Sequence, residues 1–145
     1  MAASVGTPTY SSTSALALNG GTIKDAAGNA ATLTLASVGA SNSLGANKAL
    51  VVDGTVPTVS SVTSSTANGT FKVGDAISIQ VTFSESVTVT GTPQLTLETG
   101  GTDAVVDYAS GSGGAALTFT YTVGSGHTSA DLDYASTSAL ALNDG

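Results

Sequence analysis

The side chains in this sequence that are best suited to chemistry are carboxylates and amides in turns, where they could bind a calcium ion. Asp25 and Asn29 flank a bend that contains a glycine, and Ca²⁺ prefers the carboxylate, amide and carbonyl oxygens of such turns. Asp131 and Asp133 are one residue apart, which would place both carboxylates on one face of a strand. The alternatives are an Asx turn at Asp25 and Asn29 and a solvent-facing pair at Asp131 and Asp133. The sequence contains no complete DxDxDG-type loop.

Residues for nucleophilic or acid–base catalysis are scarce. His127 is the only histidine, and its serine and aspartate neighbours lie in the same glycine- and serine-rich loop, whereas a catalytic triad usually assembles from distant segments. We therefore interpret His127 as an exposed loop histidine. Glu85 and Glu98 are the only glutamates, and nothing in the sequence pairs them as the two carboxylates of a glycosidase. The sequence predicts no enzymatic activity.

The charge balance limits the partners of the chain. Its formal net charge is −7, from 10 acidic residues against Lys24, Lys48 and Lys72, and it has no arginine. Nucleic acids and anionic lipid surfaces are bound largely through basic side chains, so we expect neither as a partner. No apolar run approaches the roughly 20 residues of a membrane span, and we expect no membrane insertion. The absence of cysteine excludes disulfides, and the first residues lack the regions of a signal peptide, so an exported parent would carry its signal elsewhere.

A ten-residue sequence occurs twice and shows that the chain contains an internal repeat. The first copy, YSSTSALALN, begins at Tyr10, and the second, YASTSALALN, begins at Tyr134, 124 positions later (134 − 10 = 124). The copies differ only at Ser11 and Ala135. Such self-similarity at a fixed period indicates a repeat architecture, and the chain spans about one period.

Alternation of apolar and polar residues predicts β-strands separated by polar turns. The clearest alternation places apolar residues at Ile77, Ile79, Val81 and Phe83, and again at Leu117, Phe119, Tyr121 and Val123. Shorter alternations occur at Val87/Val89, Leu95/Leu97, Leu140/Leu142, Leu33/Leu35 and Leu50/Val52. Strands spaced by roughly 8–12 residues, with glycine, asparagine and aspartate between them, predict an antiparallel β-sandwich.

A boundary between two parts of the chain is predicted where a short strand, a glycine turn and Pro57 follow one another. Proline can open a strand because its missing N–H is not needed there. We expect residues 1–9 to be a lead segment, residues 10–54 to be the C-terminal strands of one repeat, and residues 55–145 to be the N-terminal strands of the next.

Five segments of the chain resemble the immunoglobulin-like repeats of large bacterial adhesins and biofilm proteins. They are Val56-Pro57-Thr58-Val59, GTFKVGDAISIQVTFSESVTVTGTPQLTLETG (69–100), YASTSALALN (134–143), IKDAAGN (23–29) and KALVVDG (48–54). The resemblance implies an Ig-like sandwich on an extracellular bacterial surface, in a spacer that carries a binding domain away from the cell. It also implies that Asp25, Asn29 and Asp53 could bind calcium at the junction between repeats.

The order of these segments means that the repeat is cut out of phase. The 55–145 part would lack the strands that resemble residues 21–54, which leaves a sheet edge and an apolar face uncovered. Residues 10–54 could fold back to give a circularly permuted sandwich, or they could complete a second copy by head-to-tail strand complementation. The expected function is therefore a structural or adhesive repeat, as a spacer or a self-assembling fibre subunit. The alternative function is an Ig-like module that binds a glycan or a host protein.

Overall fold

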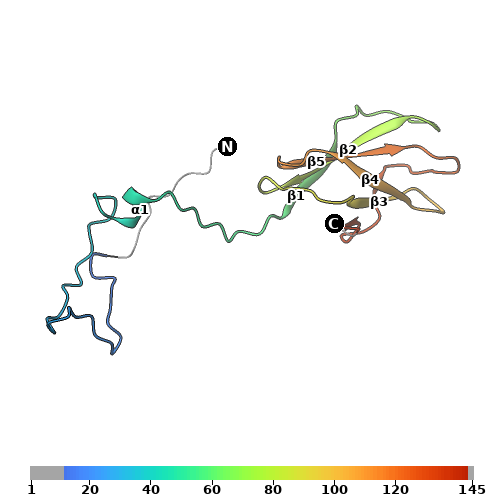
Figure 1. Ribbon diagram of the computed structural model, residues 1–145. Helices are drawn as coiled ribbons and strands as arrows, with labels where there is room; N and C mark the ends of the chain where they lie inside the picture. The colour runs from blue at the N-terminus through green and yellow to red at the C-terminus, as the bar shows by residue number, and fades with distance from the viewer. Residues whose placement is uncertain (1–11, 144–145) are drawn as a thin grey trace. The chain divides into compact units, whose positions relative to one another are not determined.

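The computed structural model describes residues 12–143, and the chain divides into two compact units between Gly54 and Thr55. Nearly all of the regular structure lies in the second unit and is β-strand (Figure 1). The predicted all-β antiparallel class is confirmed. The strands are β1 (Val59–Ser64), β2 (Ala76–Phe83), β3 (Gln94–Glu98), β4 (Ala104–Ser110), β5 (Ala116–Thr122), β6 (Asp133–Tyr134) and β7 (Leu140–Ala141).

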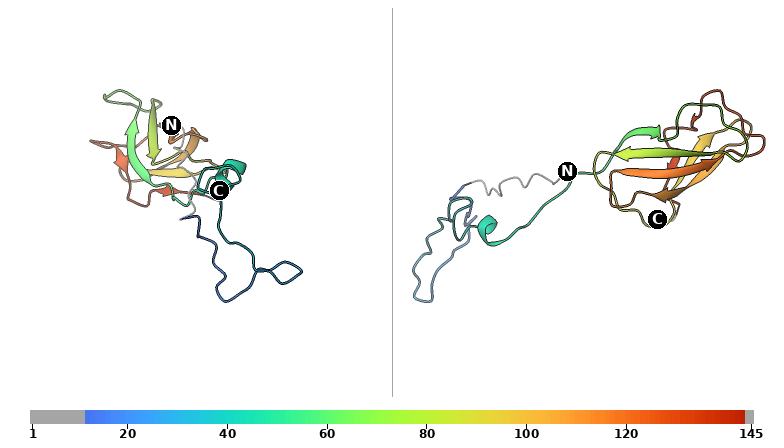
Figure 2. Two further views of the ribbon diagram at one scale, coloured as in Figure 1. Left: turned by 90° about the vertical axis from the view of Figure 1, so that its left-hand side faces the viewer. Right: turned by 90° about the horizontal axis from the view of Figure 1, so that it is seen from above.

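The strands form one antiparallel sheet in the order β1-β2-β5-β4-β3-β6, and β7 also pairs with β3. Strand β3 therefore has β4 along one edge and the two short strands β6 and β7 along the other. The sheet curls into a half-barrel, as the view from above shows (Figure 2). Because it curls, one face of β2 and β5 lies opposite β3 and β4, and the two sides share one core.

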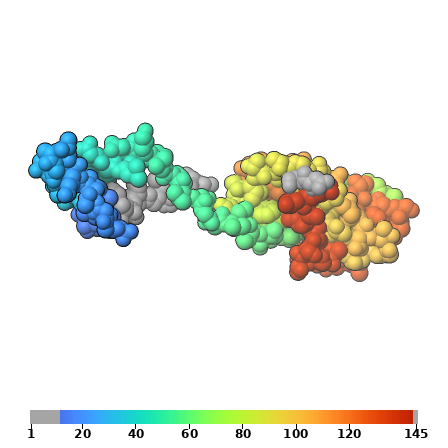
Figure 3. All heavy atoms as spheres, turned by 60° about the horizontal axis from the view of Figure 1, so that its bottom comes forward, coloured from blue at the N-terminus to red at the C-terminus, as the bar shows by residue number. Residues whose placement is uncertain are grey.

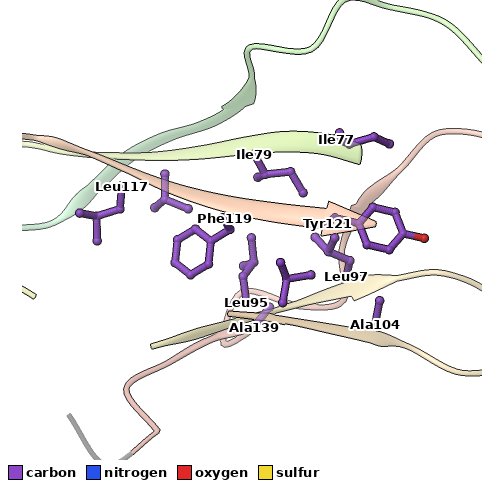
Figure 4. Close-up of a cluster of buried hydrophobic side chains, with 11 residues drawn as sticks. Ile77, Ile79, Leu95, Leu97, Ala104, Leu117, Phe119, Tyr121 and Ala139 are labelled. Atoms are coloured by element: carbon purple, nitrogen blue, oxygen red, sulfur yellow. The ribbon is translucent and has the colours of Figure 1, made fainter. Parts of the chain in front are cut away.

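Most of the core is built from the alternating residues that the sequence singled out, and Ala104, Val106 and Ala139 add to it. Phe119 is completely buried and Val81 is 1% exposed. Figure 4 shows Phe119 of β5 pointing into the space above Leu95 of β3 and Ala139. Alternate positions of β2, β3 and β5 are buried because successive side chains of a strand point to opposite faces. Covering this apolar face supplies most of the favourable free energy of folding.

The turn between β4 and β5 depends on glycine. Gly111 has a φ of 115°, a conformation that residues with a side chain rarely adopt. Its N-terminal neighbour Ser110 pairs with Thr118, and the register shifts between Tyr108 and Ser110. The hydroxyl of Tyr108 accepts the N–H of Ser112 at 2.8 Å, so the turn is fastened back onto β4.

The first unit contains little regular structure in residues 12–54. Its one helix, α1 (Leu44–Asn47), has four residues and is capped by the hydroxyl of Ser43, which accepts the N–H of Ala46 at 3.2 Å. A single β-bridge joins Lys24 and Ala30. Within this range Ser43 is the only buried residue, so the described part of the first unit has no hydrophobic core.

Several details of the strand prediction are wrong. The alternations at Leu33/Leu35 and Leu50/Val52 do not form strands, and neither does the one at Val87/Val89. Val87 and Val89 instead lie half-buried against the core, and Val87 exchanges backbone hydrogen bonds with the 111–114 turn. An alternating pattern becomes a strand only when a neighbouring strand edge is present to pair with it.

Candidate functional site

The feature of the second unit best suited to binding a partner is the opening between the outermost strands of the sheet, β1 on one side and β6 with β7 on the other. Strand β1 pairs only with β2, and β6 and β7 pair only with β3, among the strands that the structure describes. Each of these strands therefore presents one unpaired edge. An unpaired edge is a template for the backbone of another strand.

One half of this opening is a groove of about 750 Å³, which we call the β1–β6 groove. Val62 and Ser64 of β1 line one side, and Asp133 and Tyr134 of β6 line the other. Core residues from the strands between them, including Ile79 and Leu97, also line the groove. Ile79 and Leu97 are themselves buried, so the groove reaches down to the core between walls of mixed polar and apolar residues.

The other half is a groove of about 460 Å³, which we call the β1–β7 groove. Most of its lining comes from residues 83–93, at the end of β2 and in the connection to β3, and Pro57, just before β1, and Leu140 and Leu142 line it as well. Leu142 is 70% exposed. The space-filling view shows the last described residues, in red, on the surface of the second unit (Figure 3). This groove is mainly apolar in character.

Glu85 places a charge within the lining of the β1–β7 groove. Its Oε1 atom is buried and has no hydrogen-bond partner among the described residues. A buried polar atom without a partner costs about 1–3 kcal/mol of stability, and more when it is charged. A partner that brings a donor to this atom would recover that free energy. The sequence distinguishes Glu85, because it is the only charged residue between Asp75 and Glu98. The burial of its oxygen, however, is visible only in the fold.

The described part of the first unit exposes large aliphatic side chains. Its KALVVDG segment (48–54) is exposed throughout, with Leu50 68%, Val51 78% and Val52 96% exposed. Leu16, Leu18 and Ile23 are exposed as well, at 42%, 42% and 48%. Large aliphatic residues in such number without a core are expected where a segment folds against another surface.

The candidate calcium residues Asp25 and Asn29 form a turn that holds itself together. Oδ1 of Asp25 accepts the backbone N–H of Asn29 and Oδ2 accepts its side-chain N–H, both at 2.8 Å. These hydrogen bonds from Asn29, the side-chain one first, lower the pKa of the Asp25 carboxyl from its ordinary value of 3.8. Both carboxylate oxygens are therefore already engaged, as in the Asx turn that was the alternative to calcium.

The other candidate calcium residues are divided between the two units of the chain. Asp53 is exposed just before the boundary between the units. Asp131 and Asp133 both line the β1–β6 groove, but β6 begins at Asp133, so Asp131 lies before the strand. Oδ1 of Asp133 accepts the N–H of Tyr134 at 2.8 Å. Among residues 12–143 no group of three or more histidine, cysteine, aspartate or glutamate side chains is placed to hold a metal ion.

His127 is half-buried, so its interpretation as an exposed loop histidine is wrong. Its ring stacks on Tyr121 with centroids 5.9 Å apart, and its Nδ1 lies 2.8 Å from the Tyr121 hydroxyl. The N–H of Gly124 also donates to Nδ1, at 3.2 Å. The imidazole ring thus holds the loop after β5 against the core. Its hydrogen bonds to Tyr121 and Gly124 therefore have a structural role.

The two glutamates lie at opposite ends of the opening. Glu98 pairs with Asp133 at the β6 end and accepts the N–H of Gly100 at 3.1 Å, whereas Glu85 lines the β1–β7 groove.

The described residues contain no helix long and apolar enough to cross a membrane. Comparison of the chain with protein-family models, with curated proteins and with solved structures gave no match.

Proposed function

We propose that this chain is an immunoglobulin-like structural repeat of an extracellular bacterial surface protein, such as an adhesin or a biofilm matrix fibre. It acts as a spacer, or as a fibre subunit that assembles head to tail by strand complementation. The observation that carries the proposal is the combination of an open half-barrel in one unit with exposed aliphatic segments, and no core among residues 12–54, in the other. The proposal includes no catalytic step.

The internal repeat supports this pairing of groove and segment. In the first copy, the decapeptide is followed by residues 20–54. In the second copy, the same decapeptide supplies Tyr134 of β6 and both residues of β7, which lie on one side of the opening. A segment equivalent to residues 20–54 would therefore enter beside β6 and β7. It could come from an adjacent repeat or from a second copy of the chain.

Completion by a second copy would produce a filament. The surface that donates the segment differs from the surface that accepts it, so the contact is heterologous and leaves a free donor and a free acceptor at the ends of each assembly. Addition of a strand to an exposed sheet edge is an established mode of recognition. The acidic net charge of −7 favours solubility of such an assembly outside the cell.

The test is the size of the purified 145-residue chain, measured by light scattering over a concentration series and by negative-stain electron microscopy. Concentration-dependent growth into filaments is the expected outcome for a fibre subunit. A monomer of 13.9 kDa at every concentration would exclude strand exchange between copies and leave a permuted spacer domain.

Calcium enters the proposal as a stabiliser of the junction. The same measurements in millimolar Ca²⁺, the range suited to weak extracellular sites, and in chelator test this role. Filaments that shorten in chelator and recover with Ca²⁺ would support a junction ion. Filaments of equal length in both conditions would remove calcium from the proposal while leaving strand complementation in place.

A further inference from the structure

We infer that the strand inserted into the opening is Lys48–Asp53 of a second copy, running parallel to β1, with the Lys48 ammonium at the buried oxygen of Glu85. This inference rests on the proposed strand complementation and names its register, direction and electrostatic contact. It identifies the β1–β7 groove as the place where the register of assembly is decided.

The two sides of the opening run in opposite directions. Pro57, just before β1, lines the β1–β7 groove, and Val62 within β1 lines the β1–β6 groove. On the other side, Tyr134 of β6 lines the β1–β6 groove and Leu142 lines the β1–β7 groove. A strand placed between them must therefore be parallel to one side and antiparallel to the other.

The side-chain pattern of the segment selects the face that enters. Lys48, Leu50 and Val52 alternate, so in a strand they share one face. The opposite face would carry Ala49, Val51 and Asp53, with less aliphatic surface and a carboxylate. The apolar lining of the opening fits Leu50 and Val52, and the ammonium of Lys48 then enters at the same face.

The buried oxygen of Glu85 selects the direction. If the strand is parallel to β1, Lys48 enters at the β1–β7 groove, where Oε1 of Glu85 is buried without a partner among the described residues. In the reverse direction Lys48 would meet Asp131 and Asp133, which are exposed and solvated. A donor that reaches a buried carboxylate oxygen gains more free energy than one that reaches a solvated carboxylate.

The direction requires that the strand come from a second copy. A strand parallel to β1 would end with Asp53 at the β1–β6 groove, whereas β1 of the same chain begins at the β1–β7 groove. Residues 54–58 would have to run back along the whole strand. Parallel neighbours need a connection of roughly a dozen residues or more, and this segment is too short.

Charge reversal in the full chain tests the contact. We expect Glu85→Lys and Lys48→Glu each to weaken association at least about 10-fold, because each places like charges together in a desolvated groove. Lys72→Glu is the matched control: it makes the same change of charge as Lys48→Glu at a side chain that is 87% exposed and lines neither groove, so it should leave association unchanged. Far-UV circular dichroism and urea unfolding of each variant establish that the second unit remains folded.

Mixing the two reversed variants is the decisive measurement. A Lys48→Glu segment suits the groove of a Glu85→Lys copy, and the unchanged Lys48 of the latter suits the unchanged Glu85 of the former. An equimolar mixture should therefore recover association to within about threefold of the original chain. Completion within one chain could not be rescued by mixing.

The outcomes separate the inference from the proposed function. If the original chain stays monomeric, the proposed fibre and this contact are both wrong. If the chain assembles but the two reversed variants behave like Lys72→Glu, or mixing restores nothing, assembly stands and the Lys48–Glu85 contact is wrong.

Discussion

Ala15 and Ala139 occupy equivalent positions in the two copies of the repeated decapeptide and have the same local structure. Each donates its N–H to the carbonyl of the serine three residues earlier, at 3.2 Å for Ser12 and 3.1 Å for Ser136. The same two serine hydroxyls also accept an N–H two residues later in the chain, at 3.2 and 3.3 Å. Yet Ala139 is 7% exposed and belongs to the core, whereas Ala15 is exposed.

This pair gives a comparison of burial at constant local sequence. We expect Ala139→Asp to lower the free energy of unfolding of the second unit by about 3 kcal/mol or more, because it buries a carboxylate without a partner. Ala15→Asp should change it by less than about 0.5 kcal/mol. Urea unfolding followed by circular dichroism, at a concentration where the chain is monomeric, measures both. Equal effects would show that β7 does not pack as the structure has it.

The turn at Gly111 should tolerate no side chain. A Cβ atom there would overlap the carbonyl oxygen of Ala116, and the φ of 115° is itself unfavourable for alanine. We expect Gly111→Ala to destabilise the second unit by more than about 2 kcal/mol. Gly101→Ala is the control, because a Cβ there meets nothing within 4 Å, and its effect should stay within about 0.5 kcal/mol. Thermal unfolding of the two variants tests the difference.

Tyr121 should make the stability fall in alkali. Burial raises the pKa of its phenol above the ordinary value of 10.0, and this outweighs the hydrogen bond from Gly124. The folded state then keeps its proton where the unfolded state loses it, so this contribution is complete below about pH 10 and declines as the pH rises further. The decline in urea midpoint between about pH 8 and pH 11 should be smaller in Tyr121→Phe than in the original chain.

Tyr134→Phe serves as the control for this experiment, because Tyr134 is 40% exposed. Its decline should match that of the original chain. Tyr121→Phe also loses the hydrogen bond to His127, so its stability at neutral pH should be lower by about 1 kcal/mol. An alkaline decline that is unchanged in Tyr121→Phe would contradict the burial of this phenol.

Asp75 should contribute to stability in the opposite pH range. The backbone N–H of Lys72 donates to its carboxylate at 2.9 Å, and the Lys72 ammonium lies 3.5 Å away. The backbone hydrogen bond first, and then the lysine charge, lowers the pKa of Asp75 below the ordinary value of 3.8. The contribution is therefore present above about pH 4 and is lost as the pH falls through the lowered value.

Asp75→Asn should accordingly show a smaller loss of urea midpoint between about pH 5 and pH 2 than the original chain does. Asp103→Asn, at an exposed position of the same unit, supplies the comparison for a surface aspartate. If Asp75→Asn and the original chain lose stability in parallel, the Lys72 contacts do not persist in solution.

The strands with strict alternation could be predicted because the period itself encodes which face is buried. The core contains the alternating residues of β2 (Ile77, Ile79 and Val81) and of β5 (Leu117, Phe119 and Tyr121). Strand β4 was not predicted, since Val105 and Val106 are adjacent and hide the alternation. Only the second of them is buried, at 5% exposed, which its pairing with Leu95 explains.

The candidate site was harder to predict because it depends on residues that are far apart in sequence. Asp25 and Asn29 could be found from their spacing, and the structure joins them in one turn through two hydrogen bonds. The importance of Glu85 could not be found, because the burial of its oxygen depends on a groove that brings residues 83–93 together with Pro57, Leu140 and Leu142. A carboxylate on the surface and one in a groove look the same in a sequence.

The decapeptide separates what the sequence determines from what tertiary structure decides. Asn19 and Asn143 end the two copies with φ values of 45° and 50°, so the turn and the left-handed asparagine follow from local sequence through short-range hydrogen bonds. Leu140 and Ala141 of the second copy form a strand because they pair with β3, whereas their counterparts Leu16 and Ala17 in the first copy form none. Local hydrogen bonds need no neighbour, whereas strand pairing and burial need an edge and an apolar face that the rest of the fold must supply.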